Sequence, residues 1–278
     1  MSYKIVVDSC CELPQEYLND PRFERVPLGL EVGDYHLLDD ENFDQADFLK
    51  RVAECPTCPK SSCPSPERFM EAYNVDAEHI YVVTITAKLS GSYNSAELAK
   101  QLYKETYGEK MIHVVDSMSA SAAETQIALK LMELEESGLP FEKVVEEIEK
   151  YRDELETYFV LDNLETLRKN GRLTGVKAIV ATTLNIKPVM KAEEGEIAQK
   201  GQSIGIKKAL AKMVDLLVSE VKDSEKKRVV ISHCNAIAKV EAVKKLLDEK
   251  IKYKDLLVLD MAGLSSLYAN DGGIIVTI

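Results

Sequence analysis

The clearest pattern of hydrophobic and polar positions in the chain runs from His79 to Lys100. Residues 80–86 form a continuous apolar run rich in β-branched side chains, which predicts a strand buried on both faces. Alanines and charged residues with a helical spacing of apolar positions occupy 96–103 and predict a helix. The loop between them, LSGSYNS at 89–95, is rich in hydroxyl groups. We therefore expect a buried strand, a polar loop and a helix in direct succession.

This loop has two interpretations. The start of a helix presents free backbone N–H groups and the positive end of the helix dipole, so an anion could bind beside Ser90 and Gly91. Gly91 would let the backbone approach a ligand closely. In the other interpretation the loop is an ordinary helix start, capped by Asn94 or Ser95, with Glu97 in the first turn. The loop alone does not separate the two.

The rest of the chain alternates short apolar runs with amphipathic segments, as α/β proteins do. Strands are expected at 4–7, 25–30, 111–115, 157–161, 185–190, 229–232, 256–260 and 272–278. Helices are expected near Pro14, over 45–53, 119–132, 141–156, 206–222 and 236–250, and in a segment that ends at Gly171. Residues 178–183 form one more short apolar run.

The pattern changes near residue 157. Before it, strands and helices alternate, which predicts a parallel sheet. After it, a glutamate-rich turn at 193–196 joins two strands, and βαβ-like segments follow. We therefore predict an α/β protein of two domains: an N-terminal parallel-sheet α/β domain over 1–156 and a smaller mixed α/β domain over 157–278.

Three expected strands end in aspartate, at Asp8, Asp116 and Asp260. In open α/β sheets the carboxyl ends of parallel strands form the edge where ligands bind. Alternatively, each Asp-Ser pair or Asp residue caps the helix that follows. The two roles are compatible, and the sequence favours neither.

Composition narrows the class of function. The 278-residue chain is 45% hydrophobic and 29% charged, as globular proteins are, and its net charge is −12. This charge argues against nucleic acid or an anionic membrane as the main partner. No apolar run approaches the length of a membrane span, and the chain enters a strand at once without a signal peptide. We expect a cytoplasmic protein whose six cysteines are reduced.

Two segments resemble metal sites but lack the full ligand sets. Cys55 and Cys58 form a Cys-x2-Cys half-site, and no second Cys or His pair completes it. The acidic loop 39–42 lacks the glycine and the ligand spacing of an EF-hand, so we expect a solvated loop. We expect no metal ion, in particular none held jointly by the cysteines at 10, 11, 55, 58 and 63, and no cofactor.

Catalytic motifs are not apparent. Ser90 does not lie in the Gly-x-Ser-x-Gly elbow of α/β-hydrolases. His233 and a strand-end aspartate could complete a Ser-His-Asp triad only if the fold brought them to Ser90. Phosphate-binding Gly-x4-Gly-Lys and dinucleotide-binding Gly-x-Gly-x2-Gly motifs do not occur in the sequence. A hydrolase or a phosphoryl-transfer enzyme acting on a small acid stays the alternative to a binding protein.

The hydroxyl-bearing loops point to binding. Ser61 and Ser62 lie in a loop extended by prolines, and Ser90 lies at a predicted helix start. Hydroxyls and backbone amides that converge on one point hold a carboxylate or a phosphate without a counter-charge. A purely regulatory or interaction module is the third class to consider.

Together these segments resemble the DegV family, bacterial proteins that bind fatty acids. The matching pieces keep the family's order over most of the chain: 7–9 (VDS), 60–66 (KSSCPSP), 89–96 (LSGSYNSA), 115–121 (VDSMSAS), 161–165 (LDNLE), 171–172 (GR) and 184–188 (LNIKP). The resemblance implies a non-enzymatic carrier in which a long-chain fatty acid is buried between two domains. It also implies that Ser62 and Ser90 hold the carboxylate, with Ser61 and Gly91 beside them.

The resemblance places further residues near the ligand. Cys10 and Cys63 match loop positions beside the head group, as small, weakly polar residues. The family's His-x-Gly-Pro-Gly segment, whose histidine helps to hold the carboxylate, corresponds here to 268–273. Tyr268 is therefore expected to bind the ligand as a hydrogen-bond donor, but it adds no positive charge near neutral pH.

A fatty acid kinase is the partner that the resemblance implies. Family members that hand fatty acids to a kinase use a basic surface around the site. Of these residues Arg172 remains, whereas 204–206 read Ile-Gly-Ile, which puts the partnership in doubt. We expect Arg172 to be exposed near the mouth of the site, to contact a partner and not to bind the lipid.

Overall fold

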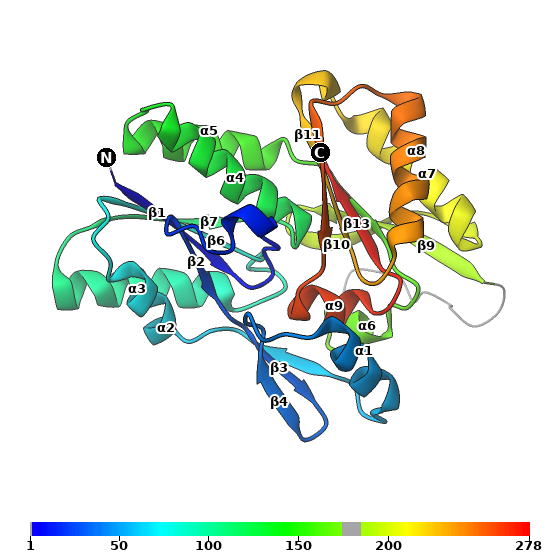
Figure 1. Cartoon of the computed structure of the whole chain (residues 1–278), viewed down its shortest axis with the longest axis horizontal. Coiled ribbons are helices and arrows are strands. Elements are labelled where there is room, and N and C mark those ends of the chain that lie inside the picture. Colours follow the sequence, from blue (N-terminus) through cyan, green and yellow to red (C-terminus); the bar gives the residue numbers. More distant parts are fainter. Residues whose placement is uncertain (1, 174–184) are drawn as a thin grey trace.

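The computed structural model describes residues 2–173 and 185–278. Two sheets dominate the molecule, one near each end of its long axis, with helices packed on them (Figure 1). The predicted α/β class is confirmed. The apolar run expected at 178–183 lies outside the described residues. None of the helices within the two described ranges combines the length and the apolar composition that crossing a membrane requires.

The first sheet is parallel throughout, with strand order β2 (Phe23–Val26), β1 (Tyr3–Asp8), β6 (His79–Thr84) and β7 (Met111–Asp116). Every residue of β6 is buried, as its continuous apolar run predicts. Helices α2 (Pro66–Tyr73) and α3 (Ser92–Tyr107) cover one face, and α4 (Ala122–Glu136) and α5 (Phe141–Asp153) cover the other (Figure 1). Each face of the sheet forms a hydrophobic core with the helices that cover it, and successive side chains along a strand point into these two cores in turn.

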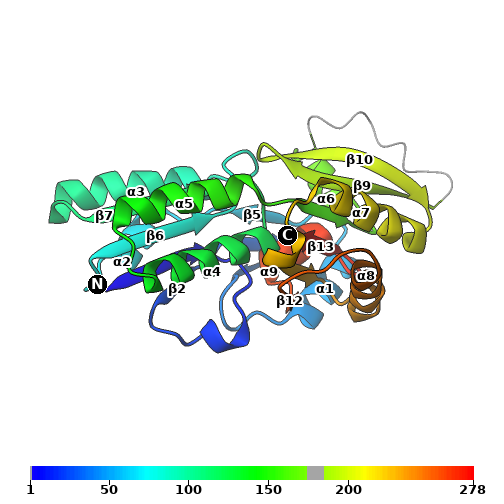
Figure 2. The ribbon, with the colours of Figure 1, turned by 90° about the horizontal axis from the view of Figure 1, so that it is seen from above.

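The second sheet is mixed and has strand order β10 (Glu196–Ile204), β9 (Ile186–Glu193), β8 (Thr157–Val160), β13 (Ile274–Thr277), β11 (Arg228–His233) and β12 (Asp255–Asp260). Among the described strands of this sheet, β11 and β12 are the only neighbours that run parallel to each other, and α8 (Ile237–Lys250) connects them. Helices α7 (Ile206–Glu220) and α8 bury their apolar sides on the outer face. The inner face turns toward α4 and the first domain (Figure 2).

A small antiparallel sheet lies beside the junction of the two large sheets, with order β4 (Tyr35–Leu38), β3 (Gly29–Val32) and β5 (Lys60–Ser62). Helices α1 (Gln45–Glu54), α6 (Glu165–Lys169) and α9 (Gly263–Ala269) gather around it (Figure 1). Apolar side chains of β3, α1 and α9 form one shared core, so this sheet connects the start of the chain with its end.

The sequence predicted most elements to within a few residues. Its largest misses are β4, α2 and α9, and the single strand expected at 25–30 is in fact the end of β2 and the start of β3. The helix expected near Pro14 is a single 3-10 turn, Gln15–Tyr17. Strands of the parallel sheet all precede residue 157 and those of the mixed sheet follow 156. The domain boundary between 156 and 157 stays a prediction.

Candidate functional site

A cavity of about 340 Å³ lies between the two large sheets, within the range of small-molecule sites. Its walls are mainly apolar, and the side chains come from both halves of the chain: Leu28, Ile85, Leu89, Phe159, Leu161, Leu167, Ile197, Leu264 and Ile275. Alternate residues 157, 159 and 161 face the cavity, because successive side chains of a strand point to opposite sides. Tyr158 and Val160 pack against α7 on the other side.

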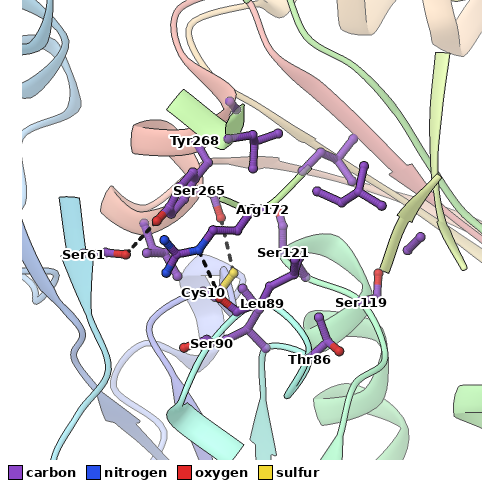
Figure 3. Close-up of a pocket in the computed structure, with 18 of the residues that line it drawn as sticks. Cys10, Ser61, Thr86, Leu89, Ser90, Ser119, Ser121, Arg172, Ser265 and Tyr268 are labelled. Atoms are coloured by element: carbon purple, nitrogen blue, oxygen red, sulfur yellow. Dashed lines mark hydrogen bonds between the residues drawn. The ribbon is translucent and has the colours of Figure 1, made fainter. Parts of the chain in front are cut away.

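At one end of the cavity the lining becomes polar. Ser61, Ser90, Arg172 and Tyr268 all lie on this side in Figure 3. They come from β5, the loop before α3, the segment after α6, and α9. Four segments far apart in the sequence therefore bring three hydroxyls and one guanidinium to the same end of an apolar space.

The Ser90 loop is held tightly in place. Backbone N–H groups of Leu89 and Ser90 donate to the Thr86 carbonyl, at 3.1 and 3.2 Å. Ser90 Oγ accepts from the Ser92 N–H at 3.2 Å and lies 3.3 Å from Ser92 Oγ. Helix α3 begins at Ser92, so the predicted caps at Asn94 and Ser95 are wrong. Ser90 and Gly91, which precede the first residue of α3, both line the cavity, so the N-terminus of this helix lies at the cavity wall.

The two adjacent serines of β5 have different surroundings. Ser61 pairs with Leu30, whose side chain is buried, and its Oγ lies 2.9 Å from the Tyr268 hydroxyl. Ser62 pairs with Gly29 and is exposed; its Oγ would lie 2.4 Å from a Cβ at Gly29. Although both residues border the cavity, the Ser61 side chain points toward Tyr268 and the Ser62 side chain packs over Gly29.

Helix α9, which carries Tyr268, is anchored by the acidic loop that the sequence predicted to be solvated. Asp39 is fully buried, and its carboxylate accepts from the N–H groups of Gly263 at 2.7 Å and Leu264 at 2.8 Å. Burial raises the pKa of Asp39, and these two hydrogen bonds oppose the rise. The prediction of a solvated loop is thus wrong at Asp39, which instead positions the helix that forms one wall of the cavity.

The exposure of Arg172 also differs from the prediction. It is half-buried and lines the cavity, so the expected exposure is wrong. Its Nε donates to the Leu89 carbonyl at 3.2 Å and its Nη1 to the Asn170 carbonyl at 2.7 Å. The guanidinium carbon lies 5.6 Å from the centre of the Tyr268 ring, a cation–π distance. Its predicted role as a partner contact stays a prediction.

Cys10 and Cys63 line the cavity, as expected, and all six cysteines are free thiols. The sulfur of Cys58 accepts from the Asn170 side chain at 3.5 Å, and that of Cys55 lies 3.2 Å from Thr57 Oγ1. In the part of the chain that the structure describes, no group of three or more His, Cys, Asp or Glu side chains is arranged to hold a metal ion.

Three buried carboxyl groups, those of Asp8, Glu12 and Glu124, accept hydrogen bonds from residues that line the cavity, and the sequence reasoning missed the two glutamates. Glu12 Oε2 accepts from Ser121 Oγ at 2.8 Å and from Ser232 Oγ at 3.1 Å. Burial raises the pKa of Glu12 to about 7 and that of Asp8 to about 6. Burial and the charge of Asp8 raise the pKa of Glu124 well above its usual range. The capping box formed by Ser121 and Glu124 was readable as Ser-x-x-Glu.

The strand-end aspartates serve the backbone. Asp8 accepts from the N–H groups of Cys10 and Ile85, both at 3.0 Å. Asp116 accepts from those of Ala87 at 3.3 Å and Met118 at 3.0 Å. These bonds hold the loops at the carboxyl edge of the parallel sheet. Asp260 ends β12 in the other sheet, so the three residues do not share one edge.

No catalytic triad forms around Ser90 among the described residues. The imidazole of His233 accepts from the Ala236 N–H at 3.2 Å through Nδ1 and lies 3.4 Å from Asp260 through Nε2. His233 is not among the residues that line the cavity, and Ser90 Oγ contacts Ser92. The site thus offers hydroxyl donors and one cation to a ligand, and within 2–173 and 185–278 no histidine or carboxylate is hydrogen-bonded to Ser90 as a general base would be.

Comparison with known proteins identifies the family. The profile described as "Uncharacterised protein, DegV family" matches residues 2–277. The chain belongs to the DegV family. A DegV domain-containing protein of Streptococcus pneumoniae is 36% identical over 281 residues, which cover 99% of this chain and 98% of that protein.

Solved DegV structures share the whole fold. A DegV family protein from Ruminococcus gnavus, described with vaccenic acid, has 52% identity, a TM-score of 0.98 and full coverage of both chains. The Streptococcus pneumoniae fatty acid kinase B3 protein, loaded with linoleic acid, has 33% identity and a TM-score of 0.90, covering 100% of this chain and 99% of that one. A DegV protein from Eubacterium eligens loaded with heptadecanoic acid has 28% identity and a TM-score of 0.90 over 99% of both chains.

Proposed function

We propose that this chain is a non-enzymatic carrier that binds one long-chain fatty acid in the cavity between its two sheets. The observation that carries the proposal is the cavity itself, a mainly apolar space with hydroxyls and a guanidinium gathered at one end. This distribution matches a molecule with one anionic group and a long hydrocarbon tail. Three structural neighbours described with vaccenic, linoleic and heptadecanoic acid support it.

The tail would provide most of the binding free energy. Each buried methylene contributes about 0.8 kcal/mol, so a chain of a dozen or more carbons gains far more than its head group does. The cavity walls are apolar side chains of both domains, and the ligand would therefore complete the packing between the two sheets.

The head group would be held at the Ser61, Ser90 and Tyr268 hydroxyls, with Gly91 leaving space at the start of α3. We assign to Ser61 the contact that was predicted for Ser62, because the Ser61 side chain points toward Tyr268. Hydrogen bonds to a charged group contribute roughly 1.5–3 kcal/mol each. An unpaired buried carboxylate would instead have to take up a proton.

Arg172 would add the positive charge that Tyr268 lacks. Its guanidinium is oriented by two backbone carbonyls and by the Tyr268 ring, at the polar end of the cavity. A guanidinium that is already oriented pairs with a carboxylate at a low entropic cost. We therefore infer that Arg172 contacts the head group, in place of the solvent-exposed role predicted from the sequence.

We further propose that the carrier presents its fatty acid to a kinase in the cytoplasm. One structural neighbour is described as a fatty acid kinase B protein, which supports such a partner. The six free thiols fit a reducing compartment. In such a pair the carrier would bind and present the carboxylate, and the kinase would act on it.

Lipid extraction followed by mass spectrometry tests the central part of the proposal. Protein purified without detergent should carry close to one fatty acid per chain, visible in native mass spectra as an adduct that organic solvent removes. A delipidated sample should take up added oleate with the same stoichiometry. Protein that holds no lipid and takes up none would contradict the proposal.

A further inference from the structure

One buried carboxyl group bridges the two halves of the chain beside the cavity. Glu12 Oε2 accepts from Ser121 Oγ at 2.8 Å, in the first half, and from Ser232 Oγ at 3.1 Å, in the second. Ser121 also lines the cavity (Figure 3). A single residue therefore connects this carboxyl group with the cavity wall, and a loss of the contact at Glu12 would loosen that wall.

The surroundings of Glu12 offer no counter-charge. Only 4% of the residue is exposed, and among the described residues its carboxyl oxygens form no ion pair with a Lys, Arg or His side chain. The start of α9 faces it with two uncharged groups, the Ser265 hydroxyl and the Ala262 backbone. On β11, the His233 ring lies 3.4 Å from Asp260. The other titratable groups near it can only add negative charge: Asp8, Cys10, Cys11 and Glu124.

Glu12 differs from the two neighbouring carboxyl groups in what its hydrogen bonds connect. Asp8 and Glu124 accept from backbone N–H groups of the first half of the chain. In the described chain, Glu12 is the member of this group of three that is also bonded to the second half. A separation of the two halves at this point would thus bring water to Glu12 first.

Ionisation of Glu12 favours such a separation. A protonated carboxyl group keeps its contacts with the two serines and carries no charge. An ionised one is costly in a buried place without a counter-charge, and water would relieve that cost. Burial raises the pKa of Glu12 to about 7, so both forms are populated near neutral pH.

We propose that Glu12 is a proton-sensitive latch between the two halves of the carrier. Its protonated form holds them together around the fatty acid, and its ionised form lets them separate and release the ligand. The inference rests on the proposed fatty-acid function, because the wall that the latch secures is the wall of the ligand site. It predicts that bound fatty acid leaves faster as the pH rises through neutrality.

The test measures the release of oleate from the loaded protein to excess serum albumin by stopped flow, at about pH 6 and pH 8. If water reaches Glu12 in the open form, its pKa there returns to 4.5, and the equilibrium constant for opening rises by about tenfold over this interval. The wild type should therefore release oleate about threefold to tenfold faster at the higher pH. Glu12→Gln cannot ionise and should lose most of this difference.

Glu105→Gln is the matched control, because Glu105 is exposed, and it should keep the wild-type ratio of the two rates. The carboxyl group of oleate titrates alike in all variants, so the difference between wild type and Glu12→Gln belongs to the protein. Ser232→Ala removes the hydroxyl that Glu12 contacts in the second half, and it should release oleate faster than the wild type at about pH 6.

The same ratio of rates in Glu12→Gln as in the wild type would overturn the latch while the fatty-acid function stands. So would a wild type that releases oleate at one rate at both pH values, or a Ser232→Ala variant with the wild-type rate at the lower pH. Failure of the wild type to bind oleate at either pH would overturn the proposed function itself.

Discussion

Strand pairing gives Ser61 and Ser62 opposite directions, although they are adjacent in the chain. Ser61 shares a face with the buried Leu30, and Ser62 shares the other face with Gly29. Only the first of these faces presents a hydroxyl to Tyr268. At the scale of single residues, the polar end of the cavity therefore depends on the register between β5 and β3.

This register predicts unequal effects of two otherwise equivalent substitutions. Ser61→Ala should weaken the binding of oleate by about tenfold, the loss of one hydrogen bond to a charged group. Ser62→Ala should change the affinity less than about twofold, because this side chain packs over Gly29. Calorimetric titration of both variants with oleate checks the assignment of the carboxylate contact to Ser61. A larger loss of affinity in Ser62→Ala than in Ser61→Ala would mean that Ser62 makes this contact.

Arg172 gives a second prediction at this scale. Arg172→Ala should weaken the binding of oleate by about tenfold or more, and of methyl oleate much less, because the ester has no charge to pair. Arg168→Ala is the control, since Arg168 is exposed and pairs with Glu165 at 2.7 Å. Equal losses for acid and ester in Arg172→Ala would mean that Arg172 only supports the loops whose carbonyls it contacts.

Sequence reasoning found the hydroxyl-bearing loops but not their orientation. Ser90 was recognisable because a serine-rich loop follows a buried strand and precedes a helix. The choice between Ser61 and Ser62 depends on pairing with β3, which no local pattern encodes. The half-buried position of Arg172 depends on carbonyls at Leu89 and Asn170, the first of them distant in the chain.

At the scale of elements, the β9–β10 hairpin closes the cavity against the first domain. Its turn residue Gly195 is buried, has a φ of +81° and lines the cavity. A Cβ at this position would lie 2.5 Å from Thr86 Oγ1. The turn therefore needs glycine both for its conformation and for its close approach to the loop after β6.

Gly195→Ala should consequently loosen this contact. We expect a loss of about 1 kcal/mol in stability from the left-handed conformation, and in addition a severalfold faster release of bound fatty acid. Gly138→Ala is the matched control, because Gly138 has a φ of +78° and a Cβ added there would meet nothing within 4 Å. Stopped-flow release measurements should separate the two variants, and identical release rates would contradict a closing role for the hairpin.

Long, strongly patterned elements were predictable, and short ones that depend on tertiary contacts were not. The strands β1, β6 and β7 and helices α5, α7 and α8 lie close to their predicted spans. Helix α9 was missed because it has only seven residues and its start is capped by Asp39, from a distant loop. Elements of this kind are stabilised by packing more than by their own propensity.

At the scale of the whole molecule, Glu12 links the two halves of the chain. It follows β1, and its carboxylate accepts hydrogen bonds from Ser121 at the start of α4 and from Ser232 in β11. Its other oxygen, Oε1, has no partner among the described residues. No local pattern marks this position as buried, because its surroundings are assembled from three segments.

This burial predicts a pH dependence of stability. The pKa of Glu12 is raised from 4.5 to about 7 in the folded protein, so between these values the folded state binds more protons than the unfolded state. The raised pKa of Glu12 therefore stabilises the folded state fully below pH 4.5, and this stabilisation is lost as the pH rises to about 7. The free energy of unfolding should fall by about 3 kcal/mol over this range because of Glu12.

Glutamine resembles the protonated form of glutamate. Glu12→Gln should therefore make the free energy of unfolding depend less on pH between about 4.5 and 7. Chemical denaturation at about pH 5 and pH 8 measures the difference, with Glu105→Gln as an exposed control that keeps the wild-type profile. A Glu12→Gln variant with the same fall in stability as the wild type would show that Glu12 is not the group responsible.

The most direct test of the fatty-acid account combines one substitution with one change in the ligand. Ser90→Ala should weaken the binding of a long-chain fatty acid by roughly tenfold to a hundredfold and should hardly affect its methyl ester. The ester keeps the tail but cannot form the same charged contact with the hydroxyls. Calorimetry of oleate and methyl oleate against both proteins gives the four affinities required. A selective loss for the acid is the predicted result, and equal losses for acid and ester, or no loss for either, would contradict it.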